Sequence, residues 1–348
     1  MLGKLILGEI KKILRPKSLI TIGVLFVIFF ILFAVFYNIN WDSLLDSIAT
    51  ETEGEVGELI EILEGEIDFL VDVDKTNVDS YISFYQSEYQ RALEQENGLD
   101  YYYKGVVTIL RYVKANDLFG QDIKIAGQPT IKASAENFAM TYFSTVLAIL
   151  YIYAIVVMAG LYADEYKNGT IKLVMLRPVT PTSVILAKII AMFIVLLSLL
   201  GITTLIGFLY GLAAFGSVGM TKVLVLFNAR HIWRMSYSGY VFLTMALSAI
   251  SLLSYGMLSF SLGTVLKRKT WAILLGLVAM LSIIASILSF LGIDRFMFSK
   301  ISNLSDYFTL NYGAPYKASF FIAMPMLIVY NALMYFAVFF ITNKRDIV

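Results

Sequence analysis

The sequence lacks cysteine and has a single histidine, His231. The missing thiols exclude disulfides, cysteine nucleophiles and thiolate metal sites, and one histidine leaves few ligands for a transition metal. Charged residues are also scarce, at 15% of 348 residues, against about 25% in a typical soluble domain. Hydrophobic residues make up 59%, and the mean hydropathy is +0.76. This composition excludes a disordered chain and indicates a polytopic membrane protein.

Charge is absent from the centre of six long apolar runs. A helix needs about 20 mostly apolar residues to cross the hydrocarbon core of a bilayer. Lys188 lies in the first turn of the third run, where we expect its side chain to extend to the membrane interface. The pattern predicts an all-α membrane protein with six transmembrane helices. The six runs are 19–39, 138–163, 184–215, 239–266, 271–291 and 319–342.

Basic residues gather at one end of the predicted bundle. Residues 1–18, which we expect to form an interfacial helix, hold five basic residues and one acidic residue. A run of three basic residues, 267–269, joins the fourth and fifth apolar runs. Because basic loops favour the cytoplasmic side, we predict that the protein lies in the cell membrane of a bacterium with both termini in the cytoplasm. Segment 216–238 then lies outside, although it holds three basic residues.

Residues 41–137 form a long polar insertion between the first two runs. They hold 20 acidic and seven basic residues, a net charge of −13. Apolar residues recur at helical spacing in 56–70, 78–93 and 99–113, so we expect about two to four amphipathic helices. The insertion is predicted to be a helical extracellular domain. Its negative charge either keeps the domain soluble or attracts a cationic ligand.

The apolar runs hold few polar side chains and no ionisable side chain near their centres. Transporters that couple to ions or protons usually carry ionisable residues inside the membrane. Energy for transport would therefore come from another chain. Ser251, Tyr255 and Asn331 are candidates for a translocation path, and close helix packing is the alternative role for the serines.

The segment between the second and third runs, 164–183, carries the most specific pattern. Residues 164–180 read DEYKNGTIKLVMLRPVT. Gly169 can end the incoming helix, Thr170 can cap a following helix, and Pro178 can end that one. Such an elbow suits docking to a soluble partner, although an ordinary turn between two spans carries the same signals.

This segment resembles the permease subunits of type-2 ATP-binding cassette (ABC) exporters. The family pattern is matched by Glu165, Gly169, Thr170, Leu176, Pro178, Val179 and Lys188. The start of the chain, around Glu9 and Lys12, is similar to the interfacial helix of that family. Pro181 stands where many members have arginine. The resemblance implies a set of residues that couple the permease to an ATPase: Glu9, Lys12, Asp164, Glu165, Tyr166, Asn168, Gly169, Thr170 and Pro178.

The resemblance also implies the partners. Two permease chains, identical or different, would pair with two P-loop ATPase subunits, which bind ATP and Mg²⁺. The chain itself has no P-loop pattern, so we expect no catalysis, cofactor or metal in it. Its other contacts would be membrane lipids, and no nucleic acid is implied. Short re-entrant helices in 292–318 would cap the path, with an extracellular gate formed by Tyr307, Phe308, Tyr312 and Tyr316. An aromatic belt at the membrane interface is the alternative role for these residues.

A hydrophobic or amphipathic substrate suits the neutral, aromatic-rich spans. Peptides or toxins come first, as in exporters of phenol-soluble modulins, and hydrophobic drugs come next. The alternative is a membrane sensor or scaffold whose outer domain binds an extracellular ligand. An intramembrane enzyme that acts on lipid ranks last, because it would need ionisable residues at depth.

Overall fold

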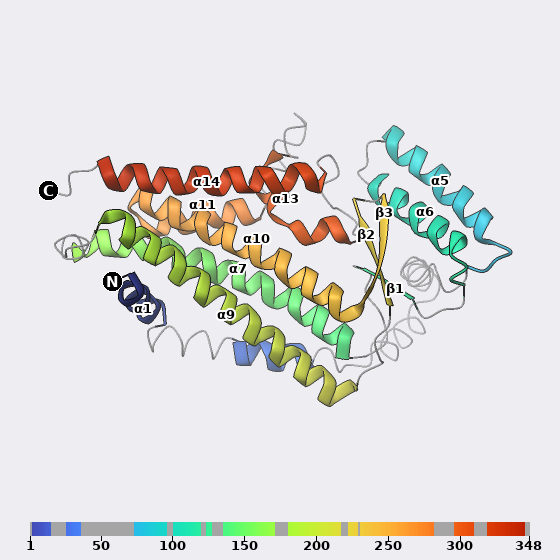
Figure 1. The fold of residues 1–348 in the computed structure, drawn as a ribbon, viewed down its shortest axis with the longest axis horizontal. Helices are drawn as coiled ribbons and strands as arrows, with labels where there is room; N and C mark the ends of the chain where they lie inside the picture. The colour runs from blue at the N-terminus through green and yellow to red at the C-terminus, as the bar shows by residue number, and fades with distance from the viewer. Residues whose placement is uncertain are drawn as a thin grey trace, which may run out of the picture.

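The computed structural model describes residues 2–14, 26–35, 73–95, 100–119, 123–126, 135–170, 180–216, 222–228, 230–281, 296–309 and 319–344. The helices form an elongated bundle, and a small domain of two helices and a three-stranded sheet lies at one end (Figure 1). We call this the sheet end. The opposite end carries helix α1 (Leu2–Ile13), and we call it the α1 end.

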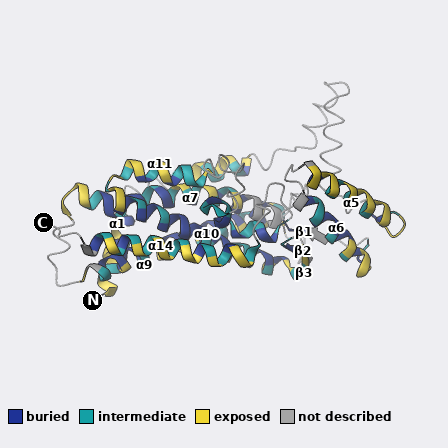
Figure 2. Cartoon of the chain, turned by 90° about the horizontal axis from the view of Figure 1, so that it is seen from above, coloured by how far each residue is buried: buried dark blue, intermediate teal, exposed yellow. Residues whose placement is uncertain are grey.

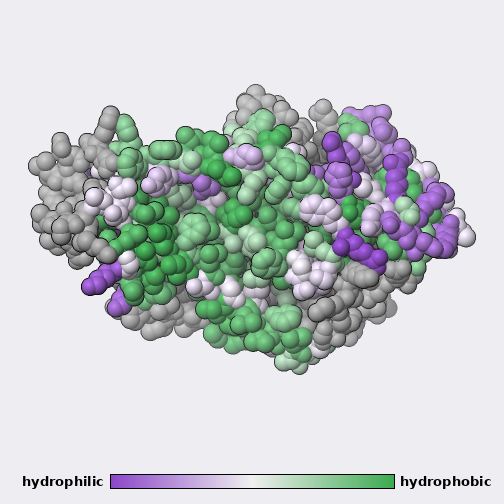
Figure 3. Space-filling model, in the orientation of Figure 1, coloured by the Kyte–Doolittle hydropathy of each residue, from purple (hydrophilic) through white to green (hydrophobic). Residues whose placement is uncertain are grey.

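Four described helices are long and apolar enough to cross a membrane. They are α7 (Ala135–Lys167), α9 (Pro181–Phe215), α10 (Tyr237–Leu266) and α14 (Phe320–Lys344). Two shorter apolar helices are Phe26–Val35 and α11 (Lys269–Met280). Hydrophobic residues cover the visible face of the bundle, whereas hydrophilic residues gather over the small domain (Figure 3). The protein is therefore a mostly helical, membrane-embedded protein.

Four of the six predicted runs correspond to these long helices, with ends that agree within four residues. The run at 19–39 is described only over 26–35, and the run at 271–291 only as far as 281. Both are helical over most of the described part. Helix α14 keeps exposed side chains along its length, whereas α10 lies largely inside the bundle (Figure 2).

Local capping sets where two of the long helices begin. Thr180 accepts a hydrogen bond from the backbone N–H of Ser183, and Pro181 occupies the first helical position of α9. Ser236 accepts a hydrogen bond from the backbone N–H of Gly239 at the start of α10. A hydroxyl at the cap satisfies a backbone donor that the helix cannot pair internally.

Small residues let α7 and α10 approach closely. The hydroxyl of Ser259 donates to the carbonyl oxygen of Ile155, at 2.6 Å. A Cβ atom added to Gly263 would lie 2.4 Å from the carbonyl oxygen of Ala159. At this crossing, the backbones themselves are in contact, which is how small residues pack membrane helices.

A three-stranded sheet departs from the predicted all-α fold. Strand β1 (Ile123–Ile125) pairs in parallel with β2 (Lys222–Phe227), which pairs antiparallel with β3 (His231–Ser236). Because β1 comes from the insertion 41–137 and the hairpin from 216–238, two segments predicted as separate outer regions form one sheet. Strand β2 is an apolar, valine-containing run that ends at Phe227, and the turn follows at Asn228, whose φ of 52° allows it.

Strand β2 is buried on both faces. Leu224 and Leu226 pack toward the helices of the small domain, and Val223, Val225 and Phe227 pack toward the bundle. A strand that is covered on both sides carries apolar residues at every position instead of alternating. The segment therefore lacks the alternation typical of a half-buried strand, and its sequence pattern predicts no strand.

Most residues of the predicted amphipathic stripes in 78–93 and 99–113 lie on the packed sides of two helices, although Leu93 is 44% exposed and residue 99 lies outside the described residues. Helices α5 (Val78–Gln95) and α6 (Asp100–Ala115) pack together and onto the sheet. The stripe in 56–70 lies outside the described residues. The start of α5 is capped by Asp74, whose Oδ1 accepts hydrogen bonds from the backbone N–H groups of Thr76 and Asn77.

The close crossing of α7 and α10 yields a test of the fold. Replacing Gly263 with alanine forces the two backbones apart, so we expect a destabilisation of about 1–3 kcal/mol, typical of overpacking. Gly201→Ala is the matched control, because nothing lies within 4 Å of a Cβ atom at that position. Thermal unfolding of the purified protein should show a lower Tm for Gly263→Ala alone. Equal Tm values for the two variants would contradict this account of the crossing.

Candidate functional site

The α1 end brings together three segments that are far apart in the sequence. Helix α1 lies beside the first turns of α9 (Figure 1). On α1, Glu9 and Ile13 are buried against the bundle, while Leu2 and Leu7 are exposed. Glu165, near the end of α7, completes the group. The amphipathic α1 thus places one carboxylate inside the protein.

Four charged side chains form one continuous network, which we call the buried charge network. Lys12 Nζ lies 2.7 Å from Glu9 Oε1 and 2.7 Å from Glu165 Oε1. Lys188 Nζ lies 3.0 Å from Glu9 Oε2 and 2.9 Å from Glu165 Oε1. Each lysine bridges both carboxylates, and the four formal charges sum to zero. The structure therefore brings together Glu9, Lys12 and Glu165 from the predicted coupling set.

The position of Lys188 in the third run predicts a side chain that extends outward, but the structure turns this side chain into the protein. Its side chain is only 2% exposed. The ammonium group has three N–H donors, and it donates to Glu9, to Glu165 and to the carbonyl oxygen of Leu161, at 3.1 Å. With every donor satisfied inside the protein, Lys188 has no reason to reach toward water.

The network is stable only as a neutral unit. Taking a single charge out of water costs several kcal/mol, and a paired, hydrogen-bonded set offsets that cost. Burial lowers the pKa of Lys12, but hydrogen bonds and charge attraction from Glu165 and Glu9 outweigh it and leave the pKa raised. Lys12 is 40% exposed, so solvent screens its share of the attraction.

The predicted elbow, 164–183, includes Glu165 of this network. Helix α7 ends at Lys167, and Gly169 has a φ of +69°, a conformation that favours glycine. Asn168 and Gly169 are exposed. The Thr170 hydroxyl donates to the carbonyl oxygen of Glu165, at 3.3 Å. The helix that Thr170 is predicted to cap would lie outside the described residues. Pro178 lies outside the described residues.

Asp164 and Tyr166 join the elbow to the turn between α10 and α11. Lys269 Nζ lies 3.2 Å from Asp164 Oδ2. Lys267 Nζ donates to the Tyr166 hydroxyl at 2.6 Å and lies 3.9 Å from the centre of its ring. All four side chains are at least partly exposed, so each contact contributes only modestly to stability.

The three candidates for a translocation path occupy two different places. Ser251 and Tyr255 are buried in α10, and the Tyr255 hydroxyl accepts a hydrogen bond from Ser302 at 2.9 Å. Ser302 ends the short helix α13 (Phe298–Ser302). Tyr255 also lies against the ring of Tyr151 on α7, with 4.9 Å between centroids. Ser251 donates to its own helix, at the carbonyl oxygen of Leu247.

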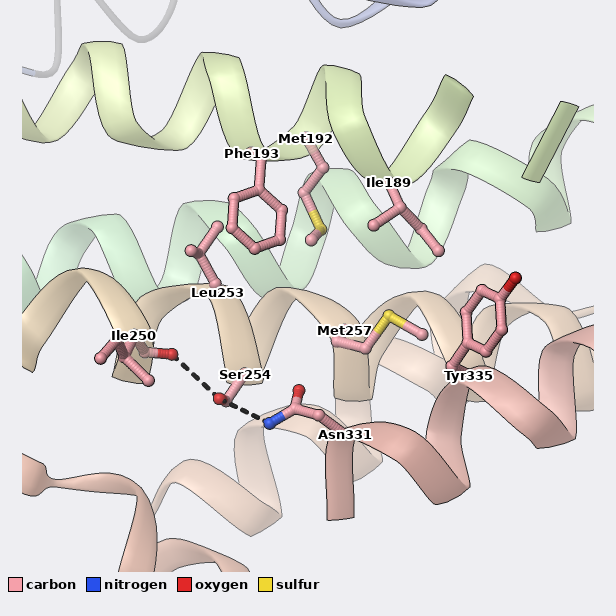
Figure 4. Close-up of a pocket in the computed structure, with 9 residues that line it drawn as sticks. All are labelled: Ile189, Met192, Phe193, Ile250, Leu253, Ser254, Met257, Asn331 and Tyr335. Atoms are coloured by element: carbon pink, nitrogen blue, oxygen red, sulfur yellow. Dashed lines mark hydrogen bonds between the residues drawn. The ribbon is translucent and has the colours of Figure 1, made fainter. Parts of the chain in front are cut away.

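Asn331 lies instead beside a cavity of about 320 Å³ between α9, α10 and α14 (Figure 4). Its amide nitrogen donates to the hydroxyl oxygen of Ser254 on α10, at 2.9 Å. Ile189, which directly follows Lys188 in α9, is one of the lining residues. A residue that lines the cavity is thus adjacent in sequence to Lys188 of the buried charge network.

The described part of the predicted re-entrant segment, 296–309, packs against α10 and α14. It contains α13 and the 3₁₀ helix η3 (Leu304–Phe308). Tyr307 and Phe308 are buried, and Phe308 stacks near Phe227 of the sheet, with ring centres 5.0 Å apart. Tyr312 and Tyr316 lie outside the described residues.

Asp306 on η3 is a partly buried carboxyl group that no sequence pattern singles out. Burial raises its pKa to about 6, against the opposing effects of a hydrogen bond from Asn303 and the charge of Lys300. The carboxylate interacts electrostatically with Tyr151 and Tyr255. Its position in a segment between two apolar runs gave no sign that it would pack against them.

A family model described as "Protein of unknown function (DUF2705)" matches residues 111–348. The "Uncharacterized protein YhcI" of Bacillus subtilis (strain 168) is 28% identical over 124 residues, which is 35% of this chain. The chain spans 40% of the length of that relative. No solved structure matches the chain.

The buried charge network yields a stability test. Replacing Lys188 with methionine leaves two buried carboxylates with one lysine between them, so we expect a loss of about 3–5 kcal/mol in folding free energy. Lys12→Met is the matched control and should cost less than Lys188→Met, because Lys12 is 40% exposed and water can take its place beside the carboxylates. Unfolding of both purified variants measures the difference. A similar loss in the two variants would contradict the central place of Lys188.

Asp306 yields a test by pH. Because its folded-state pKa is raised to about 6 from an ordinary 3.8, the folded protein binds this proton more tightly than the unfolded chain does. Stability from this group is therefore present below about pH 4 and is lost as pH rises through about 6. Asp306→Asn should have a higher Tm than the original protein at pH 7.5, and the gap should shrink at pH 5. A gap that is independent of pH would contradict this assignment.

Proposed function

The chain belongs to the DUF2705 family, and we propose that it is the permease subunit of an ABC exporter. The family description carries no activity, so the proposal rests on the chain itself. Its support is the four membrane-length helices, the resemblance of 164–180 to the exporter elbow, and the buried charge network that includes Glu165 of that elbow.

The network is the observation that carries the proposal. It ties α1, the end of α7 and the start of α9 together through Glu9, Glu165 and the two lysines. A force applied at the exposed elbow residues Asn168 and Gly169 would reach Glu165 within one helical turn. The pairs would then move two membrane-length helices and α1 as one body. This is the mechanical connection that a permease needs in order to respond to a soluble ATPase.

The proposed topology has six spans with both termini in the cytoplasm. Helix Phe26–Val35 would be part of the first span, and α11 would begin the fifth. The α1 end, with Lys267, Arg268 and Lys269, would face the cytoplasm, and the sheet end would face outward. The chain would thus be a multi-pass protein of the cell membrane, surrounded by lipid.

The ATPase would be a separate chain. The sequence contains no P-loop pattern, so ATP and Mg²⁺ would bind to the partner. Two permeases and two ATPases would make the working unit. In it, ATP-driven closure of the ATPases would be transmitted through the elbow to α7 and α9, and this chain would perform no chemistry of its own.

The substrate would be hydrophobic or amphipathic, with peptides or toxins ahead of drugs. The insertion 41–137 has a net charge of −13, which favours cationic amphipathic peptides over anionic ones. A membrane sensor or scaffold is the rival function. It would use the same outer domain for an extracellular ligand and the elbow for a signalling protein.

A photo-crosslinking amino acid at Asn168 tests the proposal. Asn168 is exposed at the α1 end, and we expect crosslinking in native membranes to capture a P-loop ATPase, identified by mass spectrometry. The same amino acid at Lys75, which is exposed at the sheet end, is the matched control and should capture no ATPase.

Two results would contradict the exporter proposal. One is the capture at Asn168 of a signalling protein without a P-loop, which would favour the sensor. The other is equal capture of the ATPase from both positions, which would show that the contact is not specific to the elbow.

A further inference from the structure

The cavity between α9, α10 and α14 is lined almost entirely by apolar side chains. Helix α10 forms its floor, and α9 and α14 form its walls (Figure 4). Its volume of about 320 Å³ falls at the small end of the range for ligand sites. The lining residues are Ile189, Met192, Phe193, Ile250, Leu253, Ser254, Met257, Asn331 and Tyr335.

The cavity opens on the apolar flank of the bundle. Phe193 in its wall is 41% exposed, and Leu186 and Leu197, which lie on the same side of α9, are 38% and 41% exposed. In a membrane, this flank meets lipid tails, so a ligand would enter from the bilayer. The cavity lies in the half of α9 that is nearer to the α1 end.

The hydrogen-bonded pair of Ser254 and Asn331 leaves one acceptor unused. The Ser254 hydroxyl donates to the carbonyl oxygen of Ile250, and the Asn331 amide nitrogen donates to Ser254 and to the carbonyl oxygen of Leu327. These acceptors fix the orientation of the amide, because an oxygen in the nitrogen position would face two other oxygens. Within the described residues, the Asn331 amide oxygen receives no hydrogen bond, and it points into the cavity (Figure 4).

The lack of charge in the lining decides the class of ligand. The lining contains no acidic or basic side chain. A charged group would therefore lose its hydration without gaining a partner, which costs far more than burying a hydroxyl. A purely apolar ligand would leave the Asn331 oxygen without a donor. A neutral molecule with an apolar chain and one donor satisfies both conditions.

We propose that this cavity binds a neutral amphiphile from the bilayer, with its hydroxyl or amide N–H donating to the amide oxygen of Asn331. The site differs in chemistry from the acidic outer domain, which would attract cations. It does not depend on the exporter proposal, because the argument uses only the cavity and its lining.

Photoaffinity labelling of the purified full chain tests the proposal. The probe is oleyl alcohol that carries a diazirine in its chain, and the competitors are oleyl alcohol, methyl oleate, which lacks a donor, and charged oleate. We expect labelling of residues that line the cavity. Oleyl alcohol should compete about threefold to tenfold better than methyl oleate, as expected for one neutral hydrogen bond, and oleate should compete least.

Two variants identify the site. Asn331→Leu keeps a similar side-chain size, so labelling should persist while the preference for the alcohol over the ester disappears. Ile189→Trp fills the cavity and should remove most labelling. Leu186→Trp is the matched control on the same side of α9 but outside the lining, and it should label as the original protein does.

Several results would overturn the proposal. One is labelling spread evenly over the exposed faces of α9 and α14. Another is equal competition by the alcohol and the ester in the original protein. A third is capture of a second copy of this chain by a photo-crosslinker at Phe193, because a partner helix would then fill the cavity.

Discussion

Two carboxylates, the buried Glu9 and the largely buried Glu165, constrain the whole α1 end of the molecule. In a medium of low dielectric constant, each must be neutralised, and Lys12 and Lys188 do so by bridging both. The pairing holds α1 against the bundle and fixes the end of α7 to the start of α9. The elbow, which contains Glu165, is thus held by a neutral network and is not a loose turn. Its proposed role in coupling depends on that attachment.

At the sheet end, strand β2 joins the small domain to the bundle. Strand β2 is shared between two cores, one with α5 and α6 and one with α10, η3 and α14. The small domain is therefore packed onto the bundle through apolar side chains and is more than a tethered insertion. Phe227 contacts Phe308, so the segment that carries Asp306 is fixed to the same strand. Through these contacts, a ligand bound at the small domain would shift η3 and α10.

The sequence predicted the parts of this structure that depend on local signals. Long apolar runs located α7, α9, α10 and α14, and glycine chemistry at Gly169 located the end of α7. The missing parts depend on contacts that are distant in the sequence. Lys188 in a first helical turn fits either an interfacial or a buried position, and its partner Glu9 is 179 residues away. Strand β2 does not alternate because both of its faces are covered. Asp306 lies in a segment whose packing no local pattern predicts.

A double-mutant cycle between Glu9 and Lys188 measures the central constraint most directly. The folding free energies of Glu9→Gln, Lys188→Met and the double variant would be compared with that of the original protein. We predict that the double variant loses much less than the two single variants added together, with a coupling energy above about 1 kcal/mol, because each single change leaves an unbalanced buried charge. Additive losses within about 0.5 kcal/mol would show two independent sites and contradict the account.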